Sequence, residues 1–170
     1  MPIFIEDFER TENSDGIFGV IGRALVIATR FDSMCKTLAR ANDLKLPTLL
    51  SGISDNDFDS LVEKALKKSI TLDKSISSLG LPDDLSVILH NARKARNAVA
   101  HDLSVGLHGC VDTKIDESIF LSEVSKYMFD LAHGEVLISI LIHEFSGEEP
   151  IRADLIPAYE DKIVTWVIEK

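Results

Sequence analysis

The stretch IFGVIGRALVIATRFDSMCKTLARAN, residues 17–42, decides the fold class. Apolar side chains return every three or four residues along it, which is the period of one face of an α-helix. Ser14 and Asp15 stand just before it as candidate N-caps. We therefore expect a long helix whose core-facing residues are Val20, Ile21, Ala24, Leu25, Ala28, Phe31, Met34, Cys35 and Leu38.

Three further segments show the same helical period. Residues 54–79 open with acidic residues, carry one apolar side and stop at Gly80 and Pro82. Residues 82–103 begin with a proline and two aspartates, as helices often do, and residues 117–144 carry another long apolar side. The sequence therefore predicts an all-α protein, an up-and-down bundle of four long helices with short N- and C-terminal additions.

The sequence does not decide the secondary structure at the two ends of the chain. The tail YEDKIVTWVIEK, residues 159–170, is rich in β-forming side chains and fits either a strand or a short helix. Ile3 and Ile5 alternate within the first twelve residues, which would suit a strand paired with the tail. Because 170 residues with 45% hydrophobic content suit one core, we expect a single domain over residues 1–170, with its core at about 16–145.

Composition narrows the class of protein. The formal net charge of −10 argues against broad adhesion to nucleic acid, whose affinity comes from many lysines and arginines, so any contact with RNA has to be local. The sequence has no run of about 18 apolar residues, and its start MPIFIEDFER has acids where a secretory signal needs bases. We therefore expect a cytoplasmic protein without membrane contact, with Cys35 and Cys110 as reduced thiols.

The segment KARNAVAHD, residues 94–102, carries the candidate chemistry. On a wheel of ~100° per residue, Arg96 and His101 fall ~140° apart, and the arc between them holds Leu89, Arg93, Asn97 and the small Ala100. We expect a shallow groove there that admits a phosphate, or a second helix carrying the same residues. The predicted core-facing residues of this helix are Leu85, Ile88, Ala92, Ala95 and Val99, and the outward ones are His90, Lys94, Asn97 and His101.

These residue types suit cleavage of a phosphodiester. The guanidinium of Arg96 can hold two phosphate oxygens and keeps its charge, so it would stabilise the dianionic transition state. His101 can take a proton from a ribose 2′-hydroxyl or return one to the leaving oxygen, and Asn97 can orient the imidazole or the phosphate. Arg93 and Lys94 are candidate substrate-binding residues, or else part of a solvated face. Such a site needs no metal and no cofactor.

The residues ARNAVAH, 95–101, late in the third long helix, resemble the Rx4–6H motif of HEPN domains, which favours a polar residue after the arginine. The resemblance covers about residues 16–145. It implies a metal-independent endoribonuclease, as in toxin–antitoxin, abortive-infection and CRISPR-associated systems, where two domains pair so that both motifs line one cleft and cleavage leaves a 2′,3′-cyclic phosphate. Arg96 would then bind the phosphate, His101 would act as acid or base, and Asn97 would position them. One branch of the family has a tyrosine at the position of Leu103.

The resemblance also implies partners. We expect a homodimer through the motif helix that acts on RNA, with an antitoxin or another defence-system protein as a further candidate partner. Two structural roles compete with catalysis, because Arg96 can pair with a carboxylate at the helix border and His101 can cap the helix. The chain would then be a non-catalytic HEPN-fold module for protein interaction and dimerisation, or a regulatory subunit whose acidic surface mimics nucleic acid.

Other patterns in the sequence are weaker. His108 and Cys110 offer two soft ligands where a zinc site needs about four. The aspartates at 55, 57 and 59 alternate as in a calcium loop but suit a helix start better. Residues 19–22, GVIG, lack the lysine of a phosphate loop, so their glycines more simply let another helix approach closely. The remaining histidines are expected to face solvent (His90) or to lie in the core or at its boundary (His133 and His143).

Overall fold

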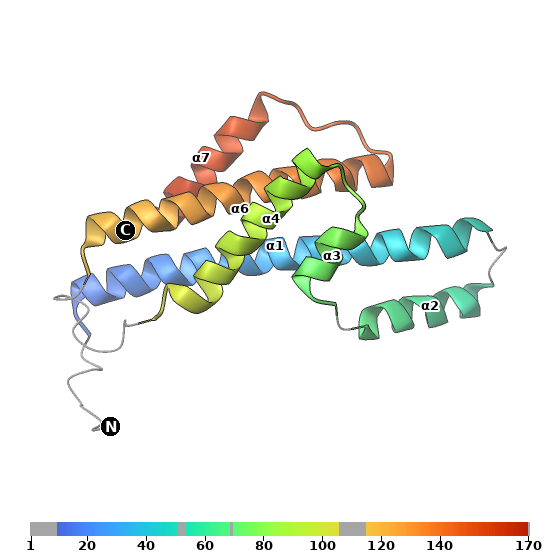
Figure 1. Ribbon diagram of the computed structural model, residues 1–170, viewed down its shortest axis with the longest axis horizontal. Helices are drawn as coiled ribbons and strands as arrows, with labels where there is room; N and C mark the ends of the chain where they lie inside the picture. The colour runs from blue at the N-terminus through green and yellow to red at the C-terminus, as the bar shows by residue number, and fades with distance from the viewer. Residues whose placement is uncertain (1–9, 51–53, 69, 106–114, 170) are drawn as a thin grey trace, which may run out of the picture.

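The computed structural model describes residues 10–50, 54–68, 70–105 and 115–169, without the side chains of 46–50. The regular structure in these ranges is entirely helical, which confirms the all-α prediction for them (Figure 1). None of the helices within them is long and apolar enough to cross a membrane. In chain order they are α1 (Glu12–Leu50), α2 (Asp55–Lys67), α3 (Leu72–Ser78), α4 (Asp83–Asn97), the π-helix η2 (Ala98–Asp102), α6 (Glu117–Ser146) and α7 (Leu155–Ile168).

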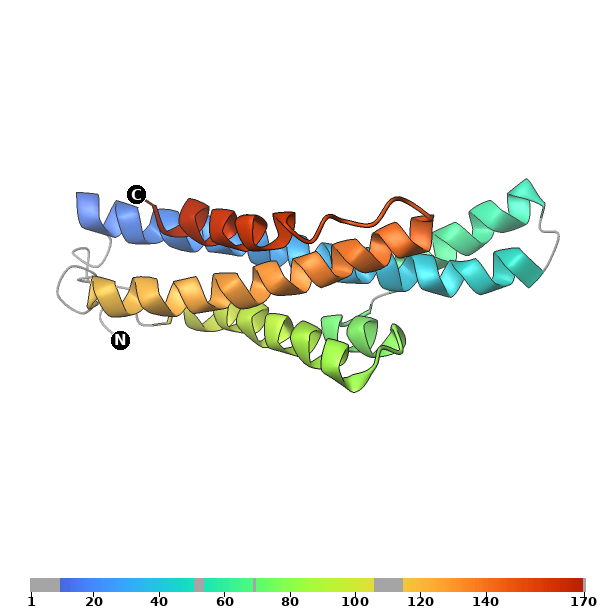
Figure 2. The ribbon, with the colours of Figure 1, turned by 90° about the horizontal axis from the view of Figure 1, so that it is seen from above.

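Two long helices, α1 and α6, form the centre of the molecule and run in the same direction (Figure 1 and Figure 2). α4 runs the opposite way and packs against both of them, and α7 returns along α6 while also contacting α1. α2 and α3 connect α1 to α4 (Figure 1). The core lies between α1, α4, α6 and α7, and its largest fully buried side chains include Phe31, Leu89, Met128, Leu131 and Ile138.

The first predicted helix is confirmed as α1, which starts earlier and ends later than expected. The backbone N–H of Ser14 donates to Thr11 Oγ1 at 3.1 Å, and that of Thr11 donates to Ser14 Oγ at 2.9 Å. Thr11 therefore caps the helix, rather than Ser14 or Asp15. The predicted core side is wrong at Leu25, which is 38% exposed, whereas Ile27 is buried.

The second predicted helix, 54–79, is wrong because it consists of two short helices, α2 and α3. Thr71 starts the second of them, since its hydroxyl accepts the backbone N–H of Lys74 at 3.3 Å. α2 buries none of its side chains, whereas α3 buries Leu72 and Ile76. The predicted bundle of four long helices therefore lacks its second member, and α7 is the fourth helix around the core.

The long helix predicted over 117–144 is confirmed as α6 and extends to Ser146. The carboxylate of Asp116 caps its start by accepting the backbone N–H of Ser118 at 3.0 Å. Gly134 does not interrupt it. A Cβ at Gly134 would lie 2.5 Å from the Cβ of Ala92 on α4, so the glycine is what allows α4 and α6 to touch.

The undecided tail is helical, as α7, so a strand there is wrong, and the first nine residues lie outside the described ranges. Arg23 on α1 holds the C-terminal end of α7, because its guanidinium donates to the carbonyls of Val167 at 3.0 Å and Glu169 at 2.6 Å. His133 on α6 lies 2.6 Å from the buried carboxylate of Glu160 on α7, which makes it a boundary histidine as predicted.

Candidate functional site

The candidate motif spans the end of α4 and the π-helix η2, which supplies His101. The N–H of Leu103 donates to the carbonyl of Ala98, five residues back, at 3.0 Å. One extra residue in a turn rotates the following side chains back by about 100° relative to a continuous α-helix. His101 lies inside this turn, so part of that rotation brings it closer to Arg96 around the helix axis than the ~140° of a continuous α-helix.

The side chain of Arg96 contacts α1. Its side chain is 28% exposed, its Nη2 lies 3.8 Å from Asp32 Oδ1, and its Nη1 donates to Asn97 Oδ1 at 3.2 Å. The same Asp32 carboxylate accepts from Lys36 at 2.6 Å. The sequence pattern did not point to Asp32, because an aspartate four residues before a lysine indicates only a pair within one helix. Asp32 and Asn97 thus fix the orientation of the guanidinium while leaving part of it open to solvent.

His101 has the opposite environment. Its side chain is exposed, and among the described residues it makes no hydrogen bond or ion pair. Asn97, one turn earlier, is half-buried, as is Ala100 beside it. An imidazole with this exposure can exchange protons with a ligand without first breaking an internal contact.

The two predicted substrate-binding residues differ in their environment. Arg93 Nε lies 3.3 Å from Asp73 Oδ1 on α3, and His90 Nδ1 lies 3.9 Å from the same oxygen. Neither nitrogen completes a hydrogen bond within the described chain, although both are buried. His90 is therefore half-buried rather than solvent-facing. Lys94 is exposed and has no ion pair among the described residues, which leaves it as the open cation of this segment.

A second polar cluster lies where α1, α6 and α7 meet. The carboxylate of Glu135 is buried and accepts from Arg30 Nε at 2.9 Å and from the hydroxyl of Tyr159. Burial, together with this hydrogen bond, raises the pKa of Tyr159, and the carboxylate raises the pKa of Arg30. A glutamate within the apolar side of a predicted helix was the only sequence sign of this cluster. Because each group already has a partner, the cluster is interpreted as an anchor for α7.

A cleft of about 420 Å³ lies beside η2, on the side of α6. The hydroxyl of Tyr127 donates to Glu123 at 2.6 Å, which raises the pKa of that tyrosine to about 12. Three carboxylates in its lining repel anions, so this cleft is not a candidate phosphate site. It is lined by Asp102, Leu103, Val105, Ile115, Asp116, Ile119, Phe120, Glu123 and Tyr127.

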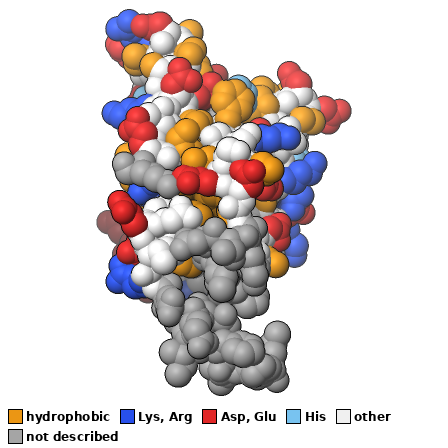
Figure 3. All heavy atoms as spheres, turned by 90° about the vertical axis from the view of Figure 1, so that its left-hand side faces the viewer, with side chains coloured by type: hydrophobic (Ala, Val, Ile, Leu, Met, Phe, Trp, Pro, Cys, Tyr) orange, Lys and Arg blue, Asp and Glu red, His pale blue; other side chains and the backbone are white. Residues whose placement is uncertain are grey.

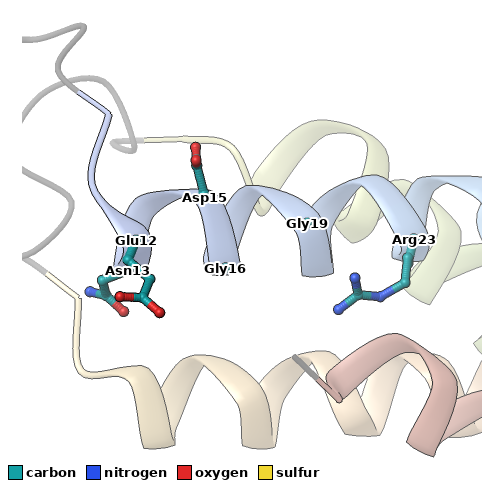
Figure 4. A pocket seen from close by; sticks show the side chains of 6 residues that line it. All are labelled: Glu12, Asn13, Asp15, Gly16, Gly19 and Arg23. Atoms are coloured by element: carbon teal, nitrogen blue, oxygen red, sulfur yellow. The ribbon is translucent and has the colours of Figure 1, made fainter.

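Another pocket, of about 630 Å³, lies beside the first turns of α1 (Figure 4). Glu12 and Asn13 stand at one end of it and Arg23 at the other, with Gly16 and Gly19 between them. Arg23 is already bound to the carbonyls of α7, so this pocket offers no unengaged cation for an anionic ligand.

Comparison with known proteins gives no matching family model, no similar curated protein and no similar solved structure. Within the described ranges, no three histidine, cysteine, aspartate or glutamate side chains gather in a way that could hold a metal ion. His108 and Cys110, which by themselves are too few for a zinc site, lie outside those ranges. Asp55 and Asp57 form the first turn of α2 behind the N-cap Ser54, as expected for a helix start.

Proposed function

We propose that the chain is a metal-independent endoribonuclease of HEPN type, a cytoplasmic toxin or phage-defence effector that acts as a homodimer. The observation that supports this best is the contrast between two side chains, Arg96 in the last turn of α4 and His101 in the π-turn that follows it. Arg96 is held by Asp32 and Asn97, as a phosphate-binding cation should be, whereas His101 is open to solvent, as a proton-transfer group should be.

The proposed reaction is an internal transesterification of RNA. Arg96 binds two oxygens of the scissile phosphate and stabilises the charge that develops on them. His101 takes the proton from the 2′-hydroxyl, the 2′-oxygen bonds to phosphorus, and the bond from phosphorus to the 5′-oxygen breaks. The leaving oxygen takes a proton from the second copy of His101 in the dimer. The products are a 2′,3′-cyclic phosphate and a 5′-hydroxyl.

Substrate binding in this proposal is local. A formal net charge of −10 repels an RNA backbone from most of the surface. Lys94 and the partly exposed Arg93 lie within one turn of Arg96 and provide positive charge at the site itself. The protein is therefore expected to bind short exposed stretches of RNA rather than long duplexes, with binding that weakens as salt rises.

A second candidate function is a non-catalytic module for protein interaction and dimerisation. The observation that favours it is that both arginines of the motif segment have carboxylate partners within the chain, Arg96 with Asp32 and Arg93 with Asp73. Under this alternative the pairs serve packing alone. An antitoxin or other defence-system protein would then be its partner.

Incubation of the purified protein with total RNA in EDTA tests both candidates. We expect wild type to cut RNA and leave 2′,3′-cyclic phosphate ends, and His101→Ala to lose at least about 100-fold in rate, because general acid–base groups contribute that much. Arg96→Ala should lose comparable activity. His90→Ala, a histidine on the same helix, is the matched control and should cut at nearly the wild-type rate. A folded wild type that leaves RNA intact would refute the nuclease and favour the module, as would equal cutting by His101→Ala.

A further inference from the structure

One face of α1 carries no carboxylate along five turns and is not covered by any other described part of the chain. Its members follow the helical spacing, and every one of them is exposed although the opposite side of α1 is packed into the core. We call this surface the outer face of α1. It consists of Phe18, Gly22, Leu25, Val26, Thr29, Ser33 and Thr37.

We infer that the outer face of α1 binds the same face of a second copy of the chain, with the two α1 helices antiparallel and crossing near Val26. The inference rests on the homodimer of the proposed function, but places the contact on α1, with the motif helix beside the interface instead of in it. A protein of net charge −10 repels its own copy over most of its surface, so two copies meet most favourably through a face without carboxylates. Isologous pairing of this kind uses one patch on both subunits.

The sizes of the side chains select the antiparallel direction. Phe18 lies in the N-terminal half of the face, whereas the C-terminal half presents the small Thr29, Ser33 and Thr37. In a parallel pair Phe18 would meet its own copy and leave the small residues opposite each other. In an antiparallel pair about residue 26, Phe18 lies opposite position 34 and packs against the neighbouring Ser33, so that large side chains fill the shallow half of the partner.

The charges at the two ends select the same direction. The outer face is flanked by Glu12 at its start and by Arg40 near its end, and residue 26 lies midway between them. Neither side chain has an ion pair among the described residues. Asp15 and Lys36 repeat this polarity one turn inward, although each already pairs within the chain. An antiparallel pair therefore places acid opposite base at both ends, whereas a parallel pair places like charges together.

Gly22 removes the steric obstacle to this packing. A Cβ built on it meets nothing within 4 Å, so none of the described residues packs against this position. A glycine in a helix interior costs about 1 kcal/mol relative to alanine, and no contact in the described part of the chain explains this one. On the outer face it lets the backbone of a second helix come close to Leu25 and Val26.

The pairing also brings the motif segments together. A two-fold axis that makes the α1 helices antiparallel places α4 of both copies on the same edge of the interface. Arg96 contacts α1 at Asp32, and η2 also packs on α1, as α4 runs toward the N-terminal half of that helix (Figure 1). Both copies of His101 would therefore flank one groove, close to the level of the two-fold axis.

The interface is expected to be modest in size. Twenty residues of helix at 1.5 Å each, about 10 Å wide, give roughly 300 Å² from α1 of each copy. A standard interface buries about 800 Å² per partner, so the edges of the neighbouring helices have to contribute. Trp166 on α7 is exposed, and it precedes Val167, whose carbonyl binds Arg23. Other hydrophobic side chains are exposed between charged ones at the end of the bundle where α1 begins and α7 ends (Figure 3). We therefore expect a concentration-dependent dimer.

Sedimentation equilibrium over a concentration series tests the inference with two matched variants. Val26 on the outer face and Val87 on α4 are both exposed valines, each 56% accessible, so a charge at either position is equally tolerable in the single chain. We expect Val26→Glu to weaken dimerisation at least about 100-fold by placing unpaired charges in the interface, and Val87→Glu to dimerise like wild type. A monomeric wild type, or a Val26→Glu variant that dimerises as wild type does, would overturn the inference.

The direction of pairing is tested by cross-linking with a short bismaleimide, with wild type as the control for its own thiols. We expect Val26→Cys to cross-link, and Phe18→Cys to fail, because two copies of residue 18 lie about 24 Å apart along the helix axis in the antiparallel pair. Efficient linking of Phe18→Cys would refute that direction. Both readouts are independent of RNA. A dimer of this kind that does not cut RNA would refute only the proposed function. A protein that cuts RNA, and whose Val26→Glu variant still dimerises, would refute only this inference.

Discussion

Gly134→Ala is expected to destabilise the protein although alanine is the better helix former. The new Cβ would lie 2.5 Å from the Cβ of Ala92 and 2.9 Å from the ring of Phe31, where carbon atoms in contact are normally separated by about 3.5–4.0 Å. Both neighbours are fully buried, so α4 has to move away from α6 by about 1 Å. Overpacking of this kind lowers the free energy of unfolding by up to about 3 kcal/mol, and the higher helix propensity of alanine raises it by about 1 kcal/mol.

Because the Cβ overlaps two buried neighbours, the upper figure applies, and the net loss is about 2 kcal/mol, or roughly 4–8 °C in Tm for a chain of this size. Urea unfolding followed by circular dichroism measures it. Gly22→Ala, measured in protein too dilute to self-associate, is the matched control and should gain about 0.5–1 kcal/mol, since its Cβ meets no neighbour. Adding Ala92→Gly should recover most of the packing loss in Gly134→Ala. A Gly134→Ala protein as stable as wild type would refute the close contact of α4 with α6.

Three further outcomes follow from the Cys35 thiol and from two polar contacts between helices. Burial raises the pKa of the Cys35 thiol to about 12, whereas the thiol of an unfolded chain ionises near about 8.5. The free energy of unfolding should therefore fall above about pH 8.5, by up to about 1.4 kcal/mol per pH unit. In Cys35→Ala it should fall less steeply. Glu135→Ala should lose about 2 kcal/mol in urea unfolding, because Tyr159 and the half-exposed Arg30 lose their shared acceptor. Arg23→Ala should speed hydrogen exchange in the last turn of α7 at least about 10-fold, because two carbonyl contacts are lost.

Each of these has a clear contrary result. Equal slopes of stability against pH for wild type and Cys35→Ala between pH 8.5 and 10 would mean that the thiol is not shielded by burial. A Glu135→Ala protein as stable as wild type would show that the cluster does not anchor α7. Unchanged exchange in Arg23→Ala, with Lys162→Ala as an exposed control on α7, would show that the last turn is held by apolar packing alone.

The helices were predictable where one apolar side runs for many turns. α1, α4 and α6 follow from their spacing because burial of such a side dominates local preferences. The break before Thr71 was missed because the apolar spacing continues through it, and the helical state of the tail was undecided because its β-branched residues favour a strand locally. α7 is helical because its buried side chains, Ile163 and Val167, share one helical face that packs on the core.

The candidate site was predictable only as a set of residues. The types and spacing of Arg96, Asn97 and His101 are visible in the sequence, but the π-turn that rotates His101 toward Arg96 is not. The partner Asp32 lies 64 positions from Arg96 and meets it only because α4 crosses α1 at that level. Likewise, the spacing of α1 placed Leu25 in the core, whereas its position on the outer face depends on where α4 and α7 lie around that helix.

The sequence by itself determined the helical class of the described residues, which residues carry candidate chemistry, and the acidic net charge, because periodicity and charge are local or additive properties. The tertiary structure alone decided which carboxylate holds Arg96, which histidine stays open to solvent, and which face of α1 is left uncovered by the other described helices. These depend on how helices distant in the chain cross one another, and crossing is set by the shapes of packed side chains rather than by spacing along any one helix.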